Sequence, residues 1–307
     1  MKHLLGINQL TKKEIQDIFT LTEKLKYENK IGKQHHLLKG KTLGMIFSKS
    51  STRTRVSFET GMYQLGGHPL FLSSNDIQLG RGEGIYDTAK VLSRYIDGIM
   101  IRTYEQSDVE QFAKYGDIPV INALTDLLHP CQILADLFTI KENFKTLSNL
   151  KLAYIGDGNN IAHSLLYGCA KTDMNISIAT PIGYECDSNV VKNAQEIAKN
   201  GSSIIDISND PIKAISDADV VYTDTWTSMG MESEKEKRIN DFKDFQINET
   251  LFSNAKKSAI FLHCLPAYRG YEVTKEIIDG ENSRIFDEAE NRLHVQKAIL
   301  VKLMGDQ

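Results

Sequence analysis

The sequence predicts an α/β protein with two doubly wound parallel-sheet domains joined by long helices. Short apolar runs alternate with amphipathic stretches along all 307 residues, and strands separated by single helices form parallel sheets that helices cover on both faces. The length corresponds to two domains of about 150 residues each. Hydrophobic residues make up 41% of the chain and charged residues 25%, a composition that indicates a folded globular protein and argues against long disorder.

Each half of the chain contains its own strands and helices. In the first half we expect strands at 42–47, 98–101 and 120–122, and helices at 56–65, 86–95 and 133–143. In the second half we expect strands at 152–155, 176–179, 204–207, 220–223 and 259–262, and helices at 189–198 and 288–303. The change from a long helix to a strand near 144–149 predicts domains at 1–146 and 147–287, with residues 288–307 packing back on the first.

Charge and cysteine content exclude several classes of protein. The formal charge is 36 − 40 = −4, whereas a general nucleic-acid binder usually carries a basic surface. No apolar run approaches the roughly 18 residues that cross a bilayer, and the N-terminus lacks a signal-peptide core. The four cysteines are scattered without a CxxC pair, which favours free thiols. We therefore expect a cytoplasmic protein with no nucleic-acid or membrane partner.

The segment 48–55 (Ser-Lys-Ser-Ser-Thr-Arg-Thr-Arg) lies between a predicted strand and a predicted helix. Hydroxyls, backbone N–H groups at a helix N-terminus and two arginines are the donors that a phosphate group binds. The glycines of a Walker loop are missing, so this is not a nucleotide P-loop. The alternative interpretation is a Ser/Thr helix cap beside exposed arginines.

A second polar group surrounds the start of the helix at 133–143. His129 and Gln132 precede this helix, and both can donate hydrogen bonds to a carbonyl oxygen. For His129 alone, a loop-capping role is at least as good an explanation. Metal ligation through His129 and Cys131 is disfavoured because no second ligand pair lies at a suitable spacing. Arg102 and Arg292 are further candidate anion ligands, although each alone is more often a surface cation.

The segment 156–161 (Gly-Asp-Gly-Asn-Asn-Ile) follows a predicted strand and begins like a dinucleotide-binding fingerprint. Ile161 stands where the third glycine would be, and its side chain would crowd the packing of helix against strand. An NAD site is therefore disfavoured. Asn159 and Asn160 lie instead at the end of a strand, where ligands of doubly wound folds bind.

Two more polar segments follow the strands 220–223 and 259–262. Asp224 provides an anion for a substrate ammonium, and the polar residues after it, including Ser228 and Met229, suit a mobile lid. Cys264 follows His263 and is a candidate nucleophile. A buried, inert thiol is the favoured interpretation, because no acidic partner that would orient the histidine is evident.

Taken together, these segments resemble the aspartate/ornithine carbamoyltransferase family, and in particular its ornithine branch. Residues 51–55 resemble the carbamoyl phosphate motif that the whole family shares, residues 129–132 (His-Pro-x-Gln) resemble its second motif, and Arg102 is the third piece. Residues 224–230 and 263–266 (His-Cys-Leu-Pro) are typical of the ornithine branch. The resemblance extends over nearly the whole chain, in the family's order and spacing.

The resemblance implies two sets of substrate ligands. Those for carbamoyl phosphate are Ser51, Thr52, Arg53, Thr54, Gln78, Arg102, His129, Gln132, Cys264, Leu265 and Arg292. Those for L-ornithine are Asn160, Asp224, Ser228 and Met229. Among them, Arg102, His129 and Cys264 receive catalytic roles. Gln78 resembles a residue that a neighbouring subunit contributes, so the family implies a homotrimer, or a stack of trimers, with shared active sites.

The activity implied is carbamoyl transfer from carbamoyl phosphate to the δ-amine of ornithine, which gives citrulline and phosphate in arginine metabolism. No metal or organic cofactor is needed, because carbamoyl phosphate is already activated. The proton of the attacking amine can pass to Cys264 or to the departing phosphate, and the sequence does not decide between them. Aspartate- or putrescine-specific transferases, a catalytically silent relative and an NAD-dependent oxidoreductase are the disfavoured alternatives. The sequence does not indicate whether the enzyme makes or degrades arginine.

Overall fold

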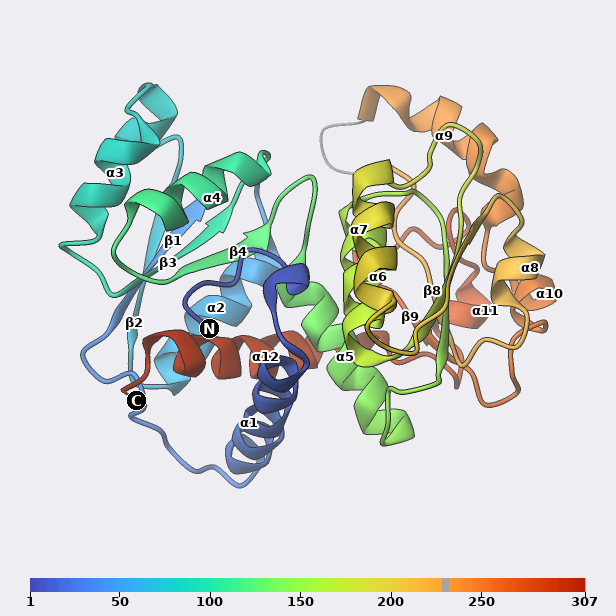
Figure 1. Ribbon diagram of the computed structural model, residues 1–307, viewed down its shortest axis with the longest axis horizontal. Coiled ribbons are helices and arrows are strands. Elements are labelled where there is room, and N and C mark those ends of the chain that lie inside the picture. Colours follow the sequence, from blue (N-terminus) through green and yellow to red (C-terminus); the bar gives the residue numbers. More distant parts are fainter. Residues whose placement is uncertain (228–231, 307) are drawn as a thin grey trace. The chain divides into compact units, whose positions relative to one another are not determined.

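The computed structural model describes residues 1–227 and 232–306, which fall into two compact units (Figure 1). One unit comprises Met1–Leu134 with Asn291–Gln307, and the other comprises Ala135–Glu290. The chain passes from one unit to the other inside two long helices, α5 (Pro130–Phe144) and α12 (Ile285–Met304). Within the described ranges, no helix combines the length and the apolar character that a membrane span requires.

The described part of the first unit contains one four-stranded parallel sheet in the order β2-β1-β3-β4. Its elements before α5 are η1 (Ile7–Gln9), α1 (Lys12–Lys30), β1 (Thr42–Phe47), α2 (Thr52–Gln64), β2 (His68–Ser73), η2 (Gln78–Arg81), α3 (Ile85–Leu92), β3 (Gly98–Arg102), α4 (Gln106–Tyr115) and β4 (Val120–Leu124). The chain runs outward from β1 to β2 and then returns past β1 to β3 and β4. Because such crossovers are right-handed, α2 covers one face of the sheet and α3 and α4 cover the other (Figure 1). The strand order reverses between β1 and β3, and ligands bind at the carboxyl ends of such strands.

Strand β2 was not expected from the sequence. It contains Pro69, whose missing N–H argues against a strand inside a sheet. The structure places β2 at the sheet edge, paired only with β1, and its residues are partly or fully exposed. An edge strand tolerates proline because one side of its backbone needs no partner.

Helix starts also differ from the periodicity-based limits. Helix α2 begins at Thr52 rather than at residue 56, because the Oγ atom of Ser51 accepts a hydrogen bond from the N–H of Thr54 at 3.2 Å. Helix α5 begins at Pro130 rather than at residue 133, since proline fits the first turn of a helix without loss of a hydrogen bond. Caps and prolines decide these boundaries, and both extend a helix beyond its apolar stripe.

The described part of the second unit contains one five-stranded parallel sheet in the order β7-β6-β5-β8-β9. Its elements after α5 are β5 (Lys151–Ile155), α6 (Asn160–Thr172), β6 (Asn175–Ala179), α7 (Ser188–Ala198), β7 (Ile205–Ser208), α8 (Pro211–Ile215), β8 (Val220–Tyr222), η3 (Glu232–Glu234), α9 (Lys235–Phe242), η4 (Lys243–Phe245), α10 (Glu249–Phe252), β9 (Ile260–Leu262) and α11 (Lys275–Ile278). Helices α6 and α7 pack side by side (Figure 1), and α8 leads back across the sheet to β8. The strand order reverses between β5 and β8, which is the second switch point.

Both sheets rest on apolar cores. In the first unit Ile46, Ile99 and Ile101 of the strands pack with Val109 and Phe112 of α4. In the second unit the strand residues Ala153, Val221 and Phe261 belong to a core that includes residues of α8 and α11. The two doubly wound sheets predicted from the sequence are therefore confirmed. Each sheet has one switch point, and polar residues at the ends of its strands can bind a ligand there.

Candidate active site

In the first unit the predicted phosphate segment lies at the switch point between β1 and β3. Phe47 and Arg102 are paired at the ends of these strands, and the N–H of Ser48 donates to the carbonyl oxygen of Arg102 at 2.8 Å. Thr52 and Arg53 are exposed in the first turn of α2. Positive helix-dipole charge, backbone donors and a guanidinium thus gather in one place, where they suit an anion.

Three predicted ligands from distant parts of the chain meet around Arg292. This residue belongs to α12, is nearly buried, and donates from Nη2 to Thr54 Oγ1 at 3.2 Å. Its Nη1 atom donates to the side-chain oxygen of Gln132 on α5. Thr54, Gln132 and Arg292 therefore form one buried polar group beside the start of α2, which a surface role for Arg292 does not explain.

His129 is held in its neutral form in this group. Burial lowers the pKa of His129 well below its ordinary value, and the positive charges of Arg292 and Arg102 lower it further. A neutral imidazole keeps one N–H and can donate one hydrogen bond from it without adding a positive charge. Arg102, His129 and Arg292 are each no more than 8% exposed, so hydrogen bonds to a carbonyl oxygen here would be little weakened by water.

Cys131, beside His129, has a structural role. Its thiol is fully buried and donates to the carbonyl oxygen of Asn122 at 3.4 Å. Burial raises the pKa of Cys131 to about 12, whereas a metal ligand needs the thiolate. The geometry gives no support to a metal site made from His129 and Cys131.

Gln78 stands apart from these residues. It begins η2 and its side chain is exposed. Within the described ranges of this single chain, no hydrogen bond connects the side chain of Gln78 to the group around Arg292. A role for Gln78 in another subunit stays a prediction.

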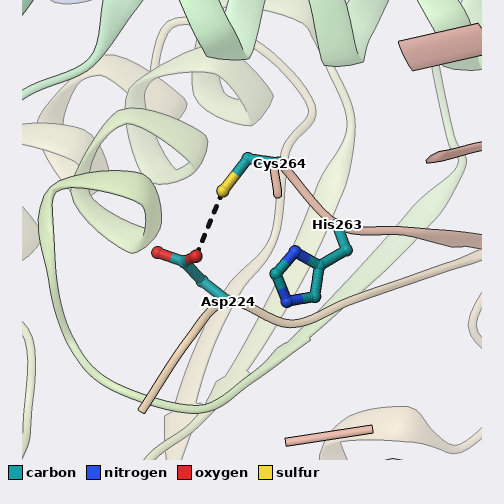
Figure 2. Close-up of side chains that lie close together, drawn as sticks. All are labelled: Asp224, His263 and Cys264. Atoms are coloured by element: carbon teal, nitrogen blue, oxygen red, sulfur yellow. Dashed lines mark hydrogen bonds between the residues drawn. The ribbon is translucent and has the colours of Figure 1, made fainter. Parts of the chain in front are cut away.

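In the second unit three segments converge on the carboxylate of Asp224, at the switch point between β5 and β8. Asn159 Nδ2 donates to Asp224 Oδ2 at 2.9 Å, and the N–H of Thr225 donates to Oδ1 at 2.7 Å. The thiol of Cys264, which follows β9, donates to the same Oδ1 at 3.1 Å (Figure 2). Asp224 is only 7% exposed. An oriented anion with this degree of burial suits a substrate ammonium group.

Cys264 is a thiol rather than a thiolate. Loss of solvent around the sulfur raises the pKa of Cys264 well above its ordinary value, and the carboxylates of Asp224 and Glu288 raise it further. Reactive cysteines need the opposite surroundings, with positive charge nearby. The structure therefore agrees with the expectation that Cys264 is not a covalent nucleophile.

Asp224, His263 and Cys264 lie close enough for one metal ion, with candidate ligand atoms all within 4.8 Å of one another (Figure 2). Both ring nitrogens of His263 are already engaged, however. Nδ1 accepts from the N–H of Leu265 at 3.0 Å, and Nε2 lies 3.2 Å from Glu272 Oε1, to which it donates in the matching tautomer. Metal binding through this histidine would break one of these bonds, so the donor set favours a structural role.

The remaining predicted substrate ligands of the second half of the chain, Leu265 for carbamoyl phosphate and the others for ornithine, have different outcomes. Asn160 is the first residue of α6 and is partly buried near Asp224's partner Asn159. Leu265 has a φ of 58° and packs against the core of the second unit, which turns the chain sharply after Cys264. Ser228 and Met229 lie outside the described residues, so their predicted roles stay predictions.

The segment 156–161 has a packing role that explains Gly158. The N–H of Gly158 donates to the carbonyl oxygen of Tyr184 at 2.9 Å. A Cβ atom on Gly158 would lie 2.4 Å from the backbone nitrogen of Cys186, so only glycine allows this approach. The second fingerprint glycine therefore faces protein backbone, and Ile161 is buried in the unit.

Two functional features were not recognised as such in the sequence. Asn159 both caps α6 and orients Asp224, and its position at a strand end was the only available signal. Arg238 on α9 donates from Nη1 to Asp157 Oδ2 at 3.0 Å and to the carbonyl oxygen of Trp226 at 2.9 Å. It thereby connects the segment that follows Asp224 to the residues after β5.

Comparison with known proteins assigns a separate binding domain to each half of the chain. Residues 2–142 match the carbamoyl-P binding domain of aspartate/ornithine carbamoyltransferases, and residues 148–303 match the Asp/Orn binding domain. The ornithine carbamoyltransferase of Caldicellulosiruptor saccharolyticus is 60% identical over 301 residues, which cover 98% of each chain.

Solved structures give the same result. The ornithine carbamoyltransferase from Pyrococcus furiosus superposes with a TM-score of 0.96 and 52% identity, covering 99% of this chain and 97% of that one. The anabolic enzyme from Campylobacter jejuni has a TM-score of 0.92 and 46% identity, with 99% of both chains covered. Both domains of the family match, and the similarity to known members extends over nearly the full length of the chain. Together with the polar groups at the two switch points, this shows that the chain belongs to the aspartate/ornithine carbamoyltransferase family.

Proposed function

We propose that the protein transfers the carbamoyl group of carbamoyl phosphate to the δ-amine of L-ornithine, giving L-citrulline and phosphate. The observation that carries the proposal is the oriented carboxylate of Asp224, which three donors hold at the switch point of the second unit. Such an anion fits the α-ammonium group of an amino acid. Relatives at 52–60% identity over nearly their whole length are named ornithine carbamoyltransferases, which supports the same substrate.

Carbamoyl phosphate is assigned to the first unit. Ser51, Thr52, Arg53 and Thr54 at the start of α2 take the phosphate, since anions bind at helix N-termini. Arg102 and the neutral His129 donate to the carbamoyl oxygen, where negative charge develops during the attack. Arg292, which donates to both Thr54 and Gln132, completes this set together with Gln132.

Ornithine is assigned to the second unit. Asp224 binds the α-ammonium group, and Asn160 contributes to the same amino-acid end of the substrate. Ser228 and Met229 are proposed as the remaining ligands. Cys264 and Leu265 border the reacting amine, with the Cys264 thiol fixed by its hydrogen bond to Asp224.

The reaction is a direct attack. The neutral δ-amine adds to the carbamoyl carbon and forms a new C–N bond. The tetrahedral intermediate then collapses, the bond between the carbamoyl carbon and the phosphate oxygen breaks, and phosphate leaves. An alkyl ammonium has a pKa near 10.4, so the substrate ammonium must first lose one proton to the solvent to become the neutral amine that attacks. Cys264 already carries its own proton, because its surroundings raise its pKa. We therefore assign the second amine proton, released as the C–N bond forms, to the departing phosphate.

The proposal is tested by offering ornithine, putrescine and aspartate in parallel and measuring citrulline, or the corresponding carbamoyl product, and phosphate. Ornithine is expected to be the preferred acceptor. Asp224→Asn should raise the KM for ornithine by at least tenfold, because it removes the charge that binds the ammonium. Asp244→Asn, at an exposed position on η4, is the matched control and should leave the KM unchanged. Preference for putrescine, or no turnover with any acceptor, would overturn the proposal.

We also propose that the enzyme works as a homotrimer, or a stack of trimers, in the cytoplasm. Val56 and Tyr63 on α2 are more than half exposed, and they lie two helical turns apart on one face of that helix, which supports an interface between copies. A second subunit would also bring Gln78 to its predicted place. Light scattering of the purified protein tests the assembly, and Gln78→Ala should lower turnover while leaving the trimer intact.

A further inference from the structure

A buried acidic cluster lies in the second unit and contacts the residue that precedes Cys264. It consists of Asp136 on α5, Tyr222 on β8, His263 after β9 and Glu288 on α12. All four side chains are fully buried. None of them is among the proposed substrate ligands, yet His263 immediately precedes Cys264.

The hydroxyl of Tyr222 faces one oxygen of each carboxyl group but has only one proton to donate. Tyr222 Oη lies 3.0 Å from Asp136 Oδ2 and 3.2 Å from Glu288 Oε1. A phenol carries a single proton and can donate it to only one of these oxygens. Burial, and then the charge of Asp136 and Glu288, raises the pKa of Tyr222 well above its ordinary value, so the hydroxyl stays protonated. The Tyr222 proton therefore serves at most one of the two carboxyl oxygens that face this hydroxyl.

The charges in the cluster favour one further proton. Asp136 and Glu288 are hydrogen-bonded to each other, and burial together with the Asp136 carboxylate raises the pKa of Glu288 well above its ordinary value. The backbone N–H of His263 donates to Glu288 Oε2 at 2.9 Å, which partly offsets this rise. Asp224 and Cys264 lie on the adjacent strand ends and add no positive charge. Two like charges in a buried contact are relieved when one group takes a proton.

We propose that Asp136 and Glu288 hold one proton between them at neutral pH, and that this carboxyl pair positions the segment that carries Cys264. With one shared proton, the Asp136–Glu288 contact, the Tyr222 hydroxyl and the His263 N–H are all satisfied. The pair then joins α5, β8 and α12 through side-chain contacts, and it joins the end of β9 through the backbone N–H of His263. It also leaves a single negative charge near Cys264, which helps to keep that thiol neutral. The value of this positioning for catalysis rests on the proposed carbamoyl transfer, whereas the shared proton does not.

Infrared spectroscopy detects the shared proton directly. At pH 8 ordinary carboxyl groups are ionised, and so is Asp157, whose pKa burial raises only to about 6. The wild-type protein should nevertheless show the C=O stretch of a protonated carboxylic acid. Glu288→Gln and Asp136→Asn should each abolish that band, because an amide supplies the donor and leaves the remaining carboxylate ionised. Glu272→Gln, which alters another buried glutamate near His263, should retain it. A wild-type spectrum without the band overturns the proposal, and so does a band that survives in both pair variants.

Alkylation of Cys264 by iodoacetamide, followed by mass spectrometry across a pH series, measures the charge of the pair. If the pair carries one charge, each single variant carries one charge too, and the pH profile of alkylation should match the wild type. The double variant Asp136→Asn, Glu288→Gln carries none, so its profile should shift to lower pH, with about tenfold more thiolate at a given pH for each unit of pKa. A shift in either single variant would mean that the wild-type pair carries two charges, which contradicts the proposal. Neither measurement depends on carbamoyl transfer, so failure of the pair leaves the proposed reaction standing.

Discussion

Substitution of Asn159 separates two roles of one side chain. Its Oδ1 atom caps α6 by accepting from the N–H groups of Ile161 at 2.9 Å and Ala162 at 3.3 Å. Its Nδ2 atom donates to Asp224 at 2.9 Å. Asn159→Ala removes both contacts. Asn159→Ser keeps an oxygen that can cap the helix but removes the amide that orients Asp224.

The expected magnitudes follow from these contacts. Loss of a cap costs about 1 kcal/mol, and loss of a hydrogen bond to a charged group costs about 1.5–3 kcal/mol. Asn159→Ser should therefore lose only the second amount, and Asn159→Ala should be less stable than Asn159→Ser by about 1 kcal/mol. Both variants should raise the KM for ornithine by the same factor, about tenfold, because 1.4 kcal/mol corresponds to a factor of ten. The backbone N–H of Thr225 and the thiol of Cys264 still hold Asp224, which limits the loss.

Urea unfolding measures the stability difference, and initial rates of citrulline formation give the KM. The matched control is Asp210→Ala, which removes the cap of α8 through the N–H groups of Ile212 and Lys213. This control should lose a similar amount of stability without a change in the KM. Equal stability of the two Asn159 variants would refute the capping role. A wild-type KM in Asn159→Ser would refute the orienting role.

Three further predictions concern other parts of the chain. Arg53→Ala should abolish carbamoyl phosphate binding in calorimetry while the unfolding midpoint stays unchanged, because Arg53 is exposed; unchanged binding would contradict its assignment. Gly158→Ala should destabilise the protein by about 1–3 kcal/mol through its clash with the backbone of Cys186, whereas Gly84→Ala, which meets nothing within 4 Å, should cost less than about 1 kcal/mol. Burial raises the pKa of Asp157 from 3.8 to about 6, so its contribution to stability is full below pH 3.8 and is lost as the pH rises through 6. Between pH 7 and pH 4 the urea-unfolding free energy of the wild type should therefore rise by about 2 kcal/mol relative to Asp157→Asn, and a constant difference would refute this.

Much of the fold follows from local pattern. The apolar runs of β1 and β5 and the amphipathic stretch of α7 appear in the structure close to their predicted limits, because burial on both faces of a parallel strand requires a continuous apolar run. Strand β2 escaped notice because an edge position tolerates Pro69, and only the finished sheet shows which strand lies at its edge. The predicted limits of α2 were wrong at its start because a single cap, Ser51, outweighs the apolar periodicity.

The chemistry-bearing residue types were also visible in the sequence, since Arg102 and Asp224 stand at strand ends and parallel strands align those ends along one edge. The contacts between functional side chains that are distant in the sequence were not visible. Arg292 meets Thr54 across 238 positions of the chain, and Asn159 meets Asp224 across 65; no local pattern encodes such distances. Burial then decides the protonation of His129, Cys264 and the carboxyl pair. A charge in a protein interior responds to every group packed around it, so these states depend on the folded arrangement, whereas the strands and helices themselves depend mainly on the order of apolar and polar residues along the chain.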